Sequence, residues 1–294
     1  MEAGRRLGGA AEILRRTPLT GGYASAGVER VDLGVDGREV AVVVKPSAPV
    51  EVAAMRAVAV VDPALVTVPR MLVTDPLVLT HVDGLPAAEG DPVPDAVWRT
   101  LAAVHRHWFR KRPRGVPVVD AAWWRALCAR TLVPLRGGLA RTGDPVYADA
   151  ADQVAAWAED PRMVAALAVL PRTLCHGDPH RGNILGGPAL PGGPGTQGPT
   201  TWTLIDWGNA RVAPAGLDLA ILQAQGATDP GPYHAVFPEL PDDLAAVERE
   251  WAQVQVHVQY LGFAADHQGA ERVAEMTATA AAALARLGPA LGVG

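Results

Sequence analysis

The chain has 294 residues, of which 49% are hydrophobic and 19% are charged, and its formal net charge is −5. This length and composition predict a folded protein with one large domain or two lobes, and they exclude wholesale disorder. The negative net charge argues against a nucleic-acid-binding protein, and the lack of a long uncharged apolar stretch argues against a membrane span.

The cysteine content and the N-terminus indicate the compartment. Cys128 and Cys175 are the two cysteines, too few for a disulfide framework and without metal-binding spacing. The charged N-terminus is not followed by an apolar segment of the kind found in secretory signals. We therefore expect a cytoplasmic protein.

The N-terminal part of the chain, residues 1–82, is predicted to be a strand-rich lobe. Asp36-Gly37 joins two apolar runs and is a strong hairpin signal. Residues 20–27 form a turn of small residues ahead of that hairpin. The expected strands are 29–33, 38–45, 71–74 and 77–82, with a helix near 50–60.

The remainder, residues 83–294, is predicted to be a mainly helical lobe. The expected helices are 96–109, 120–135, 147–158, 242–265 and 270–287. Two short strands, 183–185 and 202–205, interrupt them, and the Gly- and Pro-rich segment 186–200 between these strands is expected to be a mobile hairpin tip. The result is an α+β fold with a cleft between two lobes, where ligands commonly bind.

The chemistry centres on two aspartates. Asp178 begins a loop that reaches Asn183, and Asp206 follows an apolar strand and precedes Trp207-Gly208. The first acid can orient and deprotonate a hydroxyl, and the amide and second acid can hold magnesium on a nucleotide. Magnesium prefers such hard oxygen ligands and retains several waters. This set of side chains predicts phosphoryl transfer.

The segment His176–Asn183, the segment Ile205–Gly208 and the later Pro214–Ala220 resemble the aminoglycoside phosphotransferase and choline kinase superfamily. The resemblance implies a bilobal, protein-kinase-like fold and a kinase acting on small molecules. It also implies that Asp178 is the catalytic base and that Asn183 and Asp206 hold Mg²⁺.

The same resemblance assigns the nucleotide site. Lys45, at the end of an apolar strand, corresponds to the lysine that pairs with the α- and β-phosphates and is held by a helix glutamate. Glu51 is the candidate glutamate, although it follows Lys45 unusually closely. Either the connector is shortened or the pairing differs.

No Gly-x-Gly-x-x-Gly motif is present, and residues 20–25 occupy the place of the phosphate loop. Ser25 could donate a hydrogen bond to a phosphate there, although a plain hairpin turn explains the segment almost as well. The resemblance also implies that adenine contacts the backbone of Thr80, His81 and Val82.

Four further residues near the two acids receive expected roles. Protein kinases have a lysine two positions after the base, and this chain has His180 there, so His180 or Arg181 is expected to neutralise charge on the γ-phosphate. His176 and Asp218 are expected to hold the catalytic loop by hydrogen bonds.

The acceptor is a small molecule whose identity stays open. Between Asp206 and Glu250 the chain has eight acidic and two basic residues. An acidic wall would favour a cationic acceptor such as an aminoglycoside or an amino alcohol. A solvated acidic start of a helix explains the same residues equally well, and choline-like, sugar and amino-acid alcohol acceptors also fit.

Three classes of function compete. We favour phosphorylation of a small-molecule hydroxyl by ATP or GTP. The alternative is a catalytically weak, nucleotide-binding regulatory pseudoenzyme, which the complete set of Asp178, Asn183 and Asp206 disfavours. A protein kinase is disfavoured by His-Gly-Asp in place of His-Arg-Asp and by the lack of Ala-Pro-Glu after Asp206. The sequence does not indicate an oligomeric state.

Overall fold

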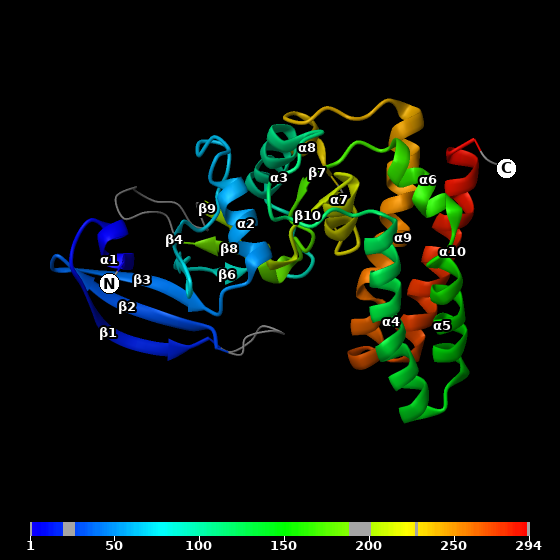
Figure 1. Ribbon diagram of the computed structural model, residues 1–294, viewed down its shortest axis with the longest axis horizontal. Coiled ribbons are helices and arrows are strands. Elements are labelled where there is room, and N and C mark those ends of the chain that lie inside the picture. The colour runs from blue at the N-terminus through cyan, green and yellow to red at the C-terminus, as the bar shows by residue number, and fades with distance from the viewer. Residues whose placement is uncertain (1, 20–26, 188–200, 227–228, 293–294) are drawn as a thin grey trace.

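The computed structural model describes residues 2–19, 27–187, 201–226 and 229–292. In these ranges a sheet-containing N-terminal lobe precedes a larger helical lobe (Figure 1). The expected bilobal α+β fold is confirmed. None of the described helices is both long enough and apolar enough to span a lipid bilayer.

The N-terminal lobe contains an antiparallel sheet with the strand order β1-β2-β3-β5-β4. Val31, Leu33 and Val35 are buried, as expected for alternate residues on one face of a strand. Asp36 and Gly37 both have positive φ (47° and 76°), the conformation of a tight two-residue hairpin turn, so the predicted hairpin is confirmed. The strands are β1 (Ala11–Pro18), β2 (Glu29–Val35), β3 (Arg38–Lys45), β4 (Met71–Thr74) and β5 (Leu77–Thr80).

Helix α2 (Pro49–Val58) connects this sheet to the active-site region. A proline opens the helix, where its missing N–H has no cost and its fixed φ suits a helix. Only three residues separate β3 from α2, so Lys45 and Glu51 lie near the adjoining ends of the two elements. Figure 1 shows α2 at the junction of the lobes, where it contacts the short 3-10 helix η2 (Trp207–Asn209).

The C-terminal lobe contains a bundle of four long helices (Figure 1). Asp120, Asp144 and Asp160 begin successive helices, and each side chain accepts a backbone N–H of the first turn. Gly143 ends α4 in the left-handed conformation. The bundle consists of α4 (Ala121–Thr142), α5 (Pro145–Trp157), α9 (Asp242–His267) and α10 (Ala270–Ala290).

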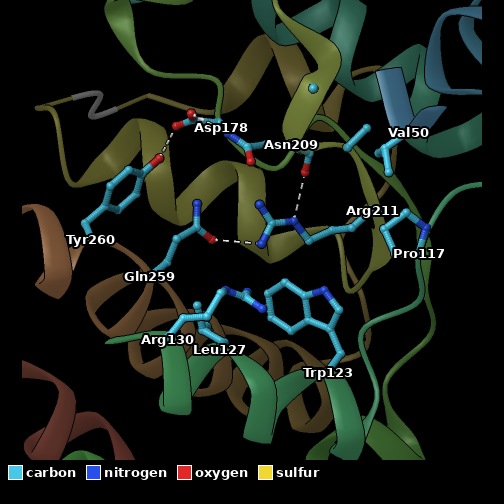
Figure 2. Close-up of a pocket in the computed structure, with 12 residues that line it drawn as sticks. Val50, Pro117, Trp123, Leu127, Arg130, Asp178, Asn209, Arg211, Gln259 and Tyr260 are labelled. Carbon is cyan, nitrogen blue, oxygen red and sulfur yellow. Dashed lines mark hydrogen bonds between the residues drawn. The ribbon is translucent and has the colours of Figure 1, made fainter. Parts of the chain in front are cut away.

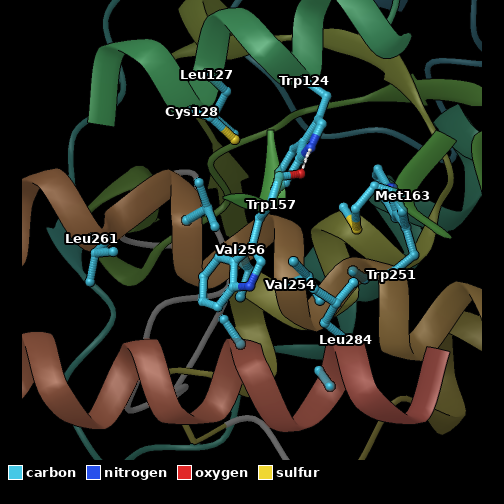
Figure 3. Packing of buried hydrophobic residues seen from close by; sticks show 14 of the residues in the cluster. Trp124, Leu127, Cys128, Trp157, Met163, Trp251, Val254, Val256, Leu261 and Leu284 are labelled. Atoms are coloured by element: carbon cyan, nitrogen blue, oxygen red, sulfur yellow. Dashed lines mark hydrogen bonds between the residues drawn. The ribbon is translucent and has the colours of Figure 1, made fainter. Parts of the chain in front are cut away.

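Large aromatic side chains fill the centre of this bundle (Figure 3). Trp124 and Trp251 are almost fully buried, and Leu284 of α10 closes the cluster from the far side. The Trp124 indole N–H donates to the Trp157 carbonyl at 2.8 Å, which satisfies its one polar group. This packing holds α4 against α9. Both helices also line the cavity beside Asp178.

Two small sheets position the motif loops. Strand β7 (Thr173–Cys175) pairs with β10 (Arg211–Ala213), and β8 (Ile184–Gly187) pairs with β9 (Thr201–Leu204) and β6 (Leu85–Pro86). The loop that contains Asp178 runs from β7 to β8, and the loop that contains Asp206 runs from β9 to β10. Each loop therefore starts on a strand that pairs with the strand where the other loop ends, since β7 pairs with β10 and β9 pairs with β8.

Some elements differ from the sequence predictions. Asn183 belongs to the 3-10 helix η1 (Arg181–Asn183) instead of a strand, and α4 continues past Pro134 to Thr142. Short elements without a strong pattern were missed, namely α1 (Glu2–Leu7), β6, β7, β10, α6 (Pro161–Val169), α7 (Gly216–Gln223) and α8 (Gly231–His234). The long helix α3 (Asp95–Trp108) was predicted within one residue at each end.

Two predictions concern segments beyond the described ranges. Ser25, with its phosphate-loop role, and most of the expected hairpin tip, residues 188–200, lie outside the described residues. Residue 82 as the end of the N-terminal lobe remains a prediction.

Leu135 tests the packing of the bundle. Its side chain is fully buried, whereas Val133 on the same helix is 69% exposed. We expect Leu135→Ala to lower the free energy of unfolding by about 2–5 kcal/mol, because it leaves a cavity. Val133→Ala should change it by no more than about 0.5 kcal/mol. Urea denaturation followed by tryptophan fluorescence compares them, and equal stabilities would contradict the packing described.

Candidate active site

A buried carboxylate holds the catalytic loop in place. Asp218 Oδ2 accepts the backbone N–H of His176 at 2.7 Å, and Oδ1 accepts that of Gly177 at 2.8 Å. His105 Nε2 lies 3.1 Å from the same carboxylate, and Tyr233 contacts the other ring nitrogen at 2.8 Å. Burial works to raise the pKa of Asp218, but His105 and the backbone donors outweigh it and lower the pKa. Asp218 therefore stays ionised and holds the catalytic loop by hydrogen bonds, as expected from the sequence.

His176 connects the two motif loops. Its Nδ1 accepts the N–H of Asp178 at 3.2 Å, and its Nε2 lies 2.9 Å from the Ile205 carbonyl. Burial lowers the pKa of His176, so the ring is neutral with its proton on Nε2. This geometry agrees with a bracing role for His176.

The Asp178 carboxylate is oriented by two residues that the sequence did not single out. Tyr260 O–H donates to Oδ1, and Asn209 Nδ2 donates to Oδ2 at 3.0 Å. Burial and the Asp178 charge raise the pKa of Tyr260, so the phenol remains a donor. Asn209 could have been noticed because it follows the Trp207-Gly208 motif, whereas Tyr260 lies on α9 with no motif around it.

Backbone contacts bring the two candidate magnesium ligands together. Asn183 Nδ2 donates to the Asp178 carbonyl at 2.9 Å, and the Asn183 carbonyl accepts the Ile205 N–H at 2.9 Å. With its amide nitrogen engaged, Asn183 has its Oδ1 as the oxygen that could bind a metal. Asp206 has φ of 63° and a side chain that is 54% exposed. One amide oxygen and one accessible carboxylate fit a magnesium ion shared with phosphates.

Lys45 joins this group from the N-terminal lobe. Its Nζ lies 2.6 Å from Glu51 Oε1 and 3.2 Å from Asp206 Oδ1. Burial works to lower the pKa of Lys45, but Asp206 and Glu51 outweigh it and raise the pKa, so the ammonium stays charged. The shortened connector between Lys45 and Glu51 therefore does not prevent the pairing.

The expected role of Arg181 is wrong in this structure. Its guanidinium is buried and donates to the carbonyls of Ala88, Asp91 and Gln225, so it braces the loop from behind. His180 is half-buried, and its Nδ1 accepts the Gly182 N–H at 3.0 Å. With Nδ1 accepting, Nε2 is the ring nitrogen that could donate to a phosphate, so His180 is the remaining candidate of the two.

The segment expected to contact adenine starts at Thr80, the last residue of strand β5, and runs to Val82. The N–H of Thr80 donates to the Arg70 carbonyl at 2.9 Å, and that of His81 donates to the Ala41 carbonyl at 3.1 Å. These two N–H groups are already engaged within the lobe. Adenine would therefore contact the other backbone groups of this segment, including those of Val82. Recognition of adenine here remains a prediction.

A cavity of about 370 Å³ opens beside Asp178 (Figure 2). It lies between α4, α9 and the loop that follows β9, and Asp178 is the single carboxylate among the described residues that line it. The lining residues are Val50, Pro117, Trp123, Leu127, Arg130, Asp178, Gly208, Asn209, Ala210, Arg211, Gln259 and Tyr260.

The acidic residues between Asp206 and Glu250 do not form a wall around this cavity. Asp218 holds the catalytic loop, and Glu250 pairs with Arg249 and Arg286. Glu248 is packed against Gly216 at the start of α7. The number of acidic residues in the sequence therefore does not describe the charge of this cavity, because these side chains point to other parts of the lobe.

A sheet-bearing lobe whose Lys45–Glu51 pair faces the Asp178 and Asp206 loops defines a phosphotransferase of the protein-kinase-like fold. The sequence profile of the phosphotransferase enzyme family matches residues 16–257. The chain belongs to this family. No curated protein sequence matches it significantly.

Solved structures share the fold at low sequence identity. A thermostable mutant of the aminoglycoside phosphotransferase APH(4)-Ia, in ternary complex with AMP-PNP and hygromycin B, is 14% identical with a TM-score of 0.56; the match covers 94% of this chain and 95% of that one. The GDP and kanamycin complex of APH(2″)-IIIa is 15% identical with a TM-score of 0.51, covering 93% and 94%.

Glu248 makes the stability of the protein depend on pH. Burial raises the pKa of its carboxyl from 4.5 to about 7, so above pH 4.5 the folded state binds more protons than the unfolded state. The associated stability is complete below the unfolded pKa and is lost as pH rises through 7. We expect Glu248→Gln to be more stable than the wild type by about 1–3 kcal/mol near pH 8 and equally stable near pH 4.

Thermal or urea denaturation at both pH values measures this difference. Exposed Asp152→Asn is the control, since it removes one carboxylate without changing a buried group. A pH-independent difference between Glu248→Gln and the wild type would contradict the assignment.

Proposed function

We propose that the protein transfers the γ-phosphate of ATP or GTP to a hydroxyl group of a small molecule. The observation that carries this proposal is the position of the Asp178 carboxylate. It opens on a cavity, while its own loop supplies Asn183, whose carbonyl accepts the N–H of Ile205, the residue before Asp206. One loop thus provides the base for the acceptor and one of the candidate metal ligands, while Asp206 and Lys45 come from other elements.

The family membership and the structural relatives support this activity. APH(4)-Ia has been solved with AMP-PNP and hygromycin B, and APH(2″)-IIIa with GDP and kanamycin. Each pairs a nucleotide with a small acceptor in the same fold. A cavity of about 370 Å³ lies at the lower end of the range of about 300–1,000 Å³ typical of small-ligand sites.

In the proposed reaction, Asp178 aligns the acceptor hydroxyl and takes its proton. Tyr260 and Asn209 hold the carboxylate, so it need not reorient during the reaction. Lys45, kept charged and positioned by Glu51, binds phosphate oxygens. Asn183 and Asp206 would hold magnesium, which neutralises phosphate charge when bound. His180, from the same loop, could donate a hydrogen bond from Nε2 to the transferred phosphate.

Asp178→Asn tests the base. We expect turnover to fall by about 10²–10⁴-fold, because the amide cannot accept the proton. Nucleotide affinity should stay close to that of the wild type. Nucleotide consumption with an acceptor and nucleotide binding by calorimetry measure the two effects, with exposed Asp152→Asn as the matched control. Wild-type turnover in Asp178→Asn would refute the role of Asp178.

Asp206→Asn tests the metal site. Loss of the carboxylate should raise the magnesium concentration needed for half-maximal activity by at least about tenfold. Removing a residue that only hydrogen-bonds to a metal ligand already weakens metal binding by about 10–100-fold, and Asp206 is proposed as a ligand itself. Activity titrated with magnesium at fixed nucleotide measures the shift. An unchanged magnesium requirement would exclude Asp206 as a ligand.

A further inference from the structure

The cavity beside Asp178 is lined by more positive than negative charge. Its charged lining residues are Asp178, Arg130 and Arg211, and Asp178 already accepts from Tyr260 and Asn209 (Figure 2). An acceptor that enters this space meets two guanidinium groups and one hydrogen-bonded carboxylate. This balance bears on the class of molecule that can bind.

Arg211 forms the base of the cavity and lacks a carboxylate partner among the described residues. It is 5% exposed, and its guanidinium donates to neutral oxygens: the Asn209 carbonyl at 3.0 Å, the Gly177 carbonyl at 3.0 Å and Gln259 Oε1 at 3.1 Å. A guanidinium keeps its charge even when buried. Asp218 and Asp178 offset part of the cost of burying this charge without forming an ion pair with it, and an anion bound nearby would offset more.

Arg130 is an exposed residue of α4 on the opposite wall. Within the described part of the chain its guanidinium makes no hydrogen bond or ion pair, and its contact is with the Trp123 ring, 5.9 Å from the ring centroid. The Arg211 guanidinium lies 4.9 Å from the same centroid. Figure 2 shows both guanidinium groups next to this indole. Both positive charges thus lie against one indole ring at the edge of the cavity.

We propose that the acceptor is an alcohol that carries a carboxylate or phosphate group, with the anionic group bound by Arg130 beside Arg211. The inference rests on the proposed function and specifies its substrate class. The planar guanidinium fork matches both kinds of oxyanion. A polycationic acceptor would instead bring ammonium groups against two arginines, which opposes binding.

The transfer itself follows the proposed reaction. The acceptor oxygen forms a bond to the γ-phosphorus, its proton passes to Asp178, and the bond from that phosphorus to the β–γ bridging oxygen breaks. The nucleoside diphosphate leaves with the electron pair. The anionic group of the acceptor stays on Arg130 and takes no part in bond breaking.

Binding of matched probes tests the class of acceptor without requiring turnover. Calorimetry on the enzyme with ADP and magnesium would compare gluconate, glucose and glucosamine, then glycerol 3-phosphate with glycerol, and finally kanamycin. We expect each anionic probe to bind more tightly than its neutral or cationic counterpart. The two anionic probes separate carboxylate from phosphate recognition. Equal or reversed order, including no binding by any probe, would overturn the inference.

The second arm locates the binding site. Arg130→Gln should weaken binding of the anionic probes by about ten- to a hundredfold, the range expected for losing a hydrogen bond to a charged group. Arg136→Gln removes the same charge from an exposed position of the same helix outside the cavity, and should bind like the wild type. Equal affinities in Arg130→Gln and Arg136→Gln would also overturn the inference.

The two proposals fail in different ways. Binding of anions through Arg130 without phosphate transfer to any compound would count against the proposed function and leave the anion site in place. Transfer of the γ-phosphate to glucosamine or kanamycin in preference to gluconate and glycerol 3-phosphate would confirm the kinase and refute the anionic acceptor.

Discussion

The active site depends on one buried interaction, the acceptance of two consecutive backbone N–H groups by Asp218. These donors belong to His176 and Gly177, the residues just before the proposed base. Gly177 has φ of 81°, and a Cβ there would collide with the Asn209 carbonyl. The loop can turn Asp178 toward the cavity because the ionised Asp218 accepts these two N–H groups and because residue 177 is a glycine. His105 contacts the Asp218 carboxylate and keeps it ionised.

Residues close together in sequence were the ones that could be predicted. Asp178, Asn183 and Asp206 occur in short motifs, and the hairpin at Asp36-Gly37 and the long helices follow from local pattern alone. The Lys45–Glu51 pair was also reachable, because a strand end and a helix start three residues apart must be neighbours. Local chemistry is sufficient for this part of the site.

Sequence reasoning could not predict where long side chains point. Tyr260 reaches Asp178 from a helix 82 positions away, and no pattern in α9 distinguishes it from its neighbours. Arg181 lies in the catalytic loop yet turns its guanidinium toward the carbonyls of Ala88 and Asp91. The excess of acids after Asp206 was real in number, but Asp218 and Glu250 are used inside the lobe. Tertiary packing decides which way these side chains point. A count of charges along the chain does not contain that information.

Helix α9 serves two tasks at once. Tyr260 positions the proposed base, while the adjacent Gln259 contacts both the buried Arg211 and the Gly177 carbonyl. A shift of this helix that reshaped the pocket for a new compound would also disturb the alignment of Asp178. Selectivity and catalytic rate are thus mechanically linked in this protein, and evolutionary change of one would require compensating change in the other.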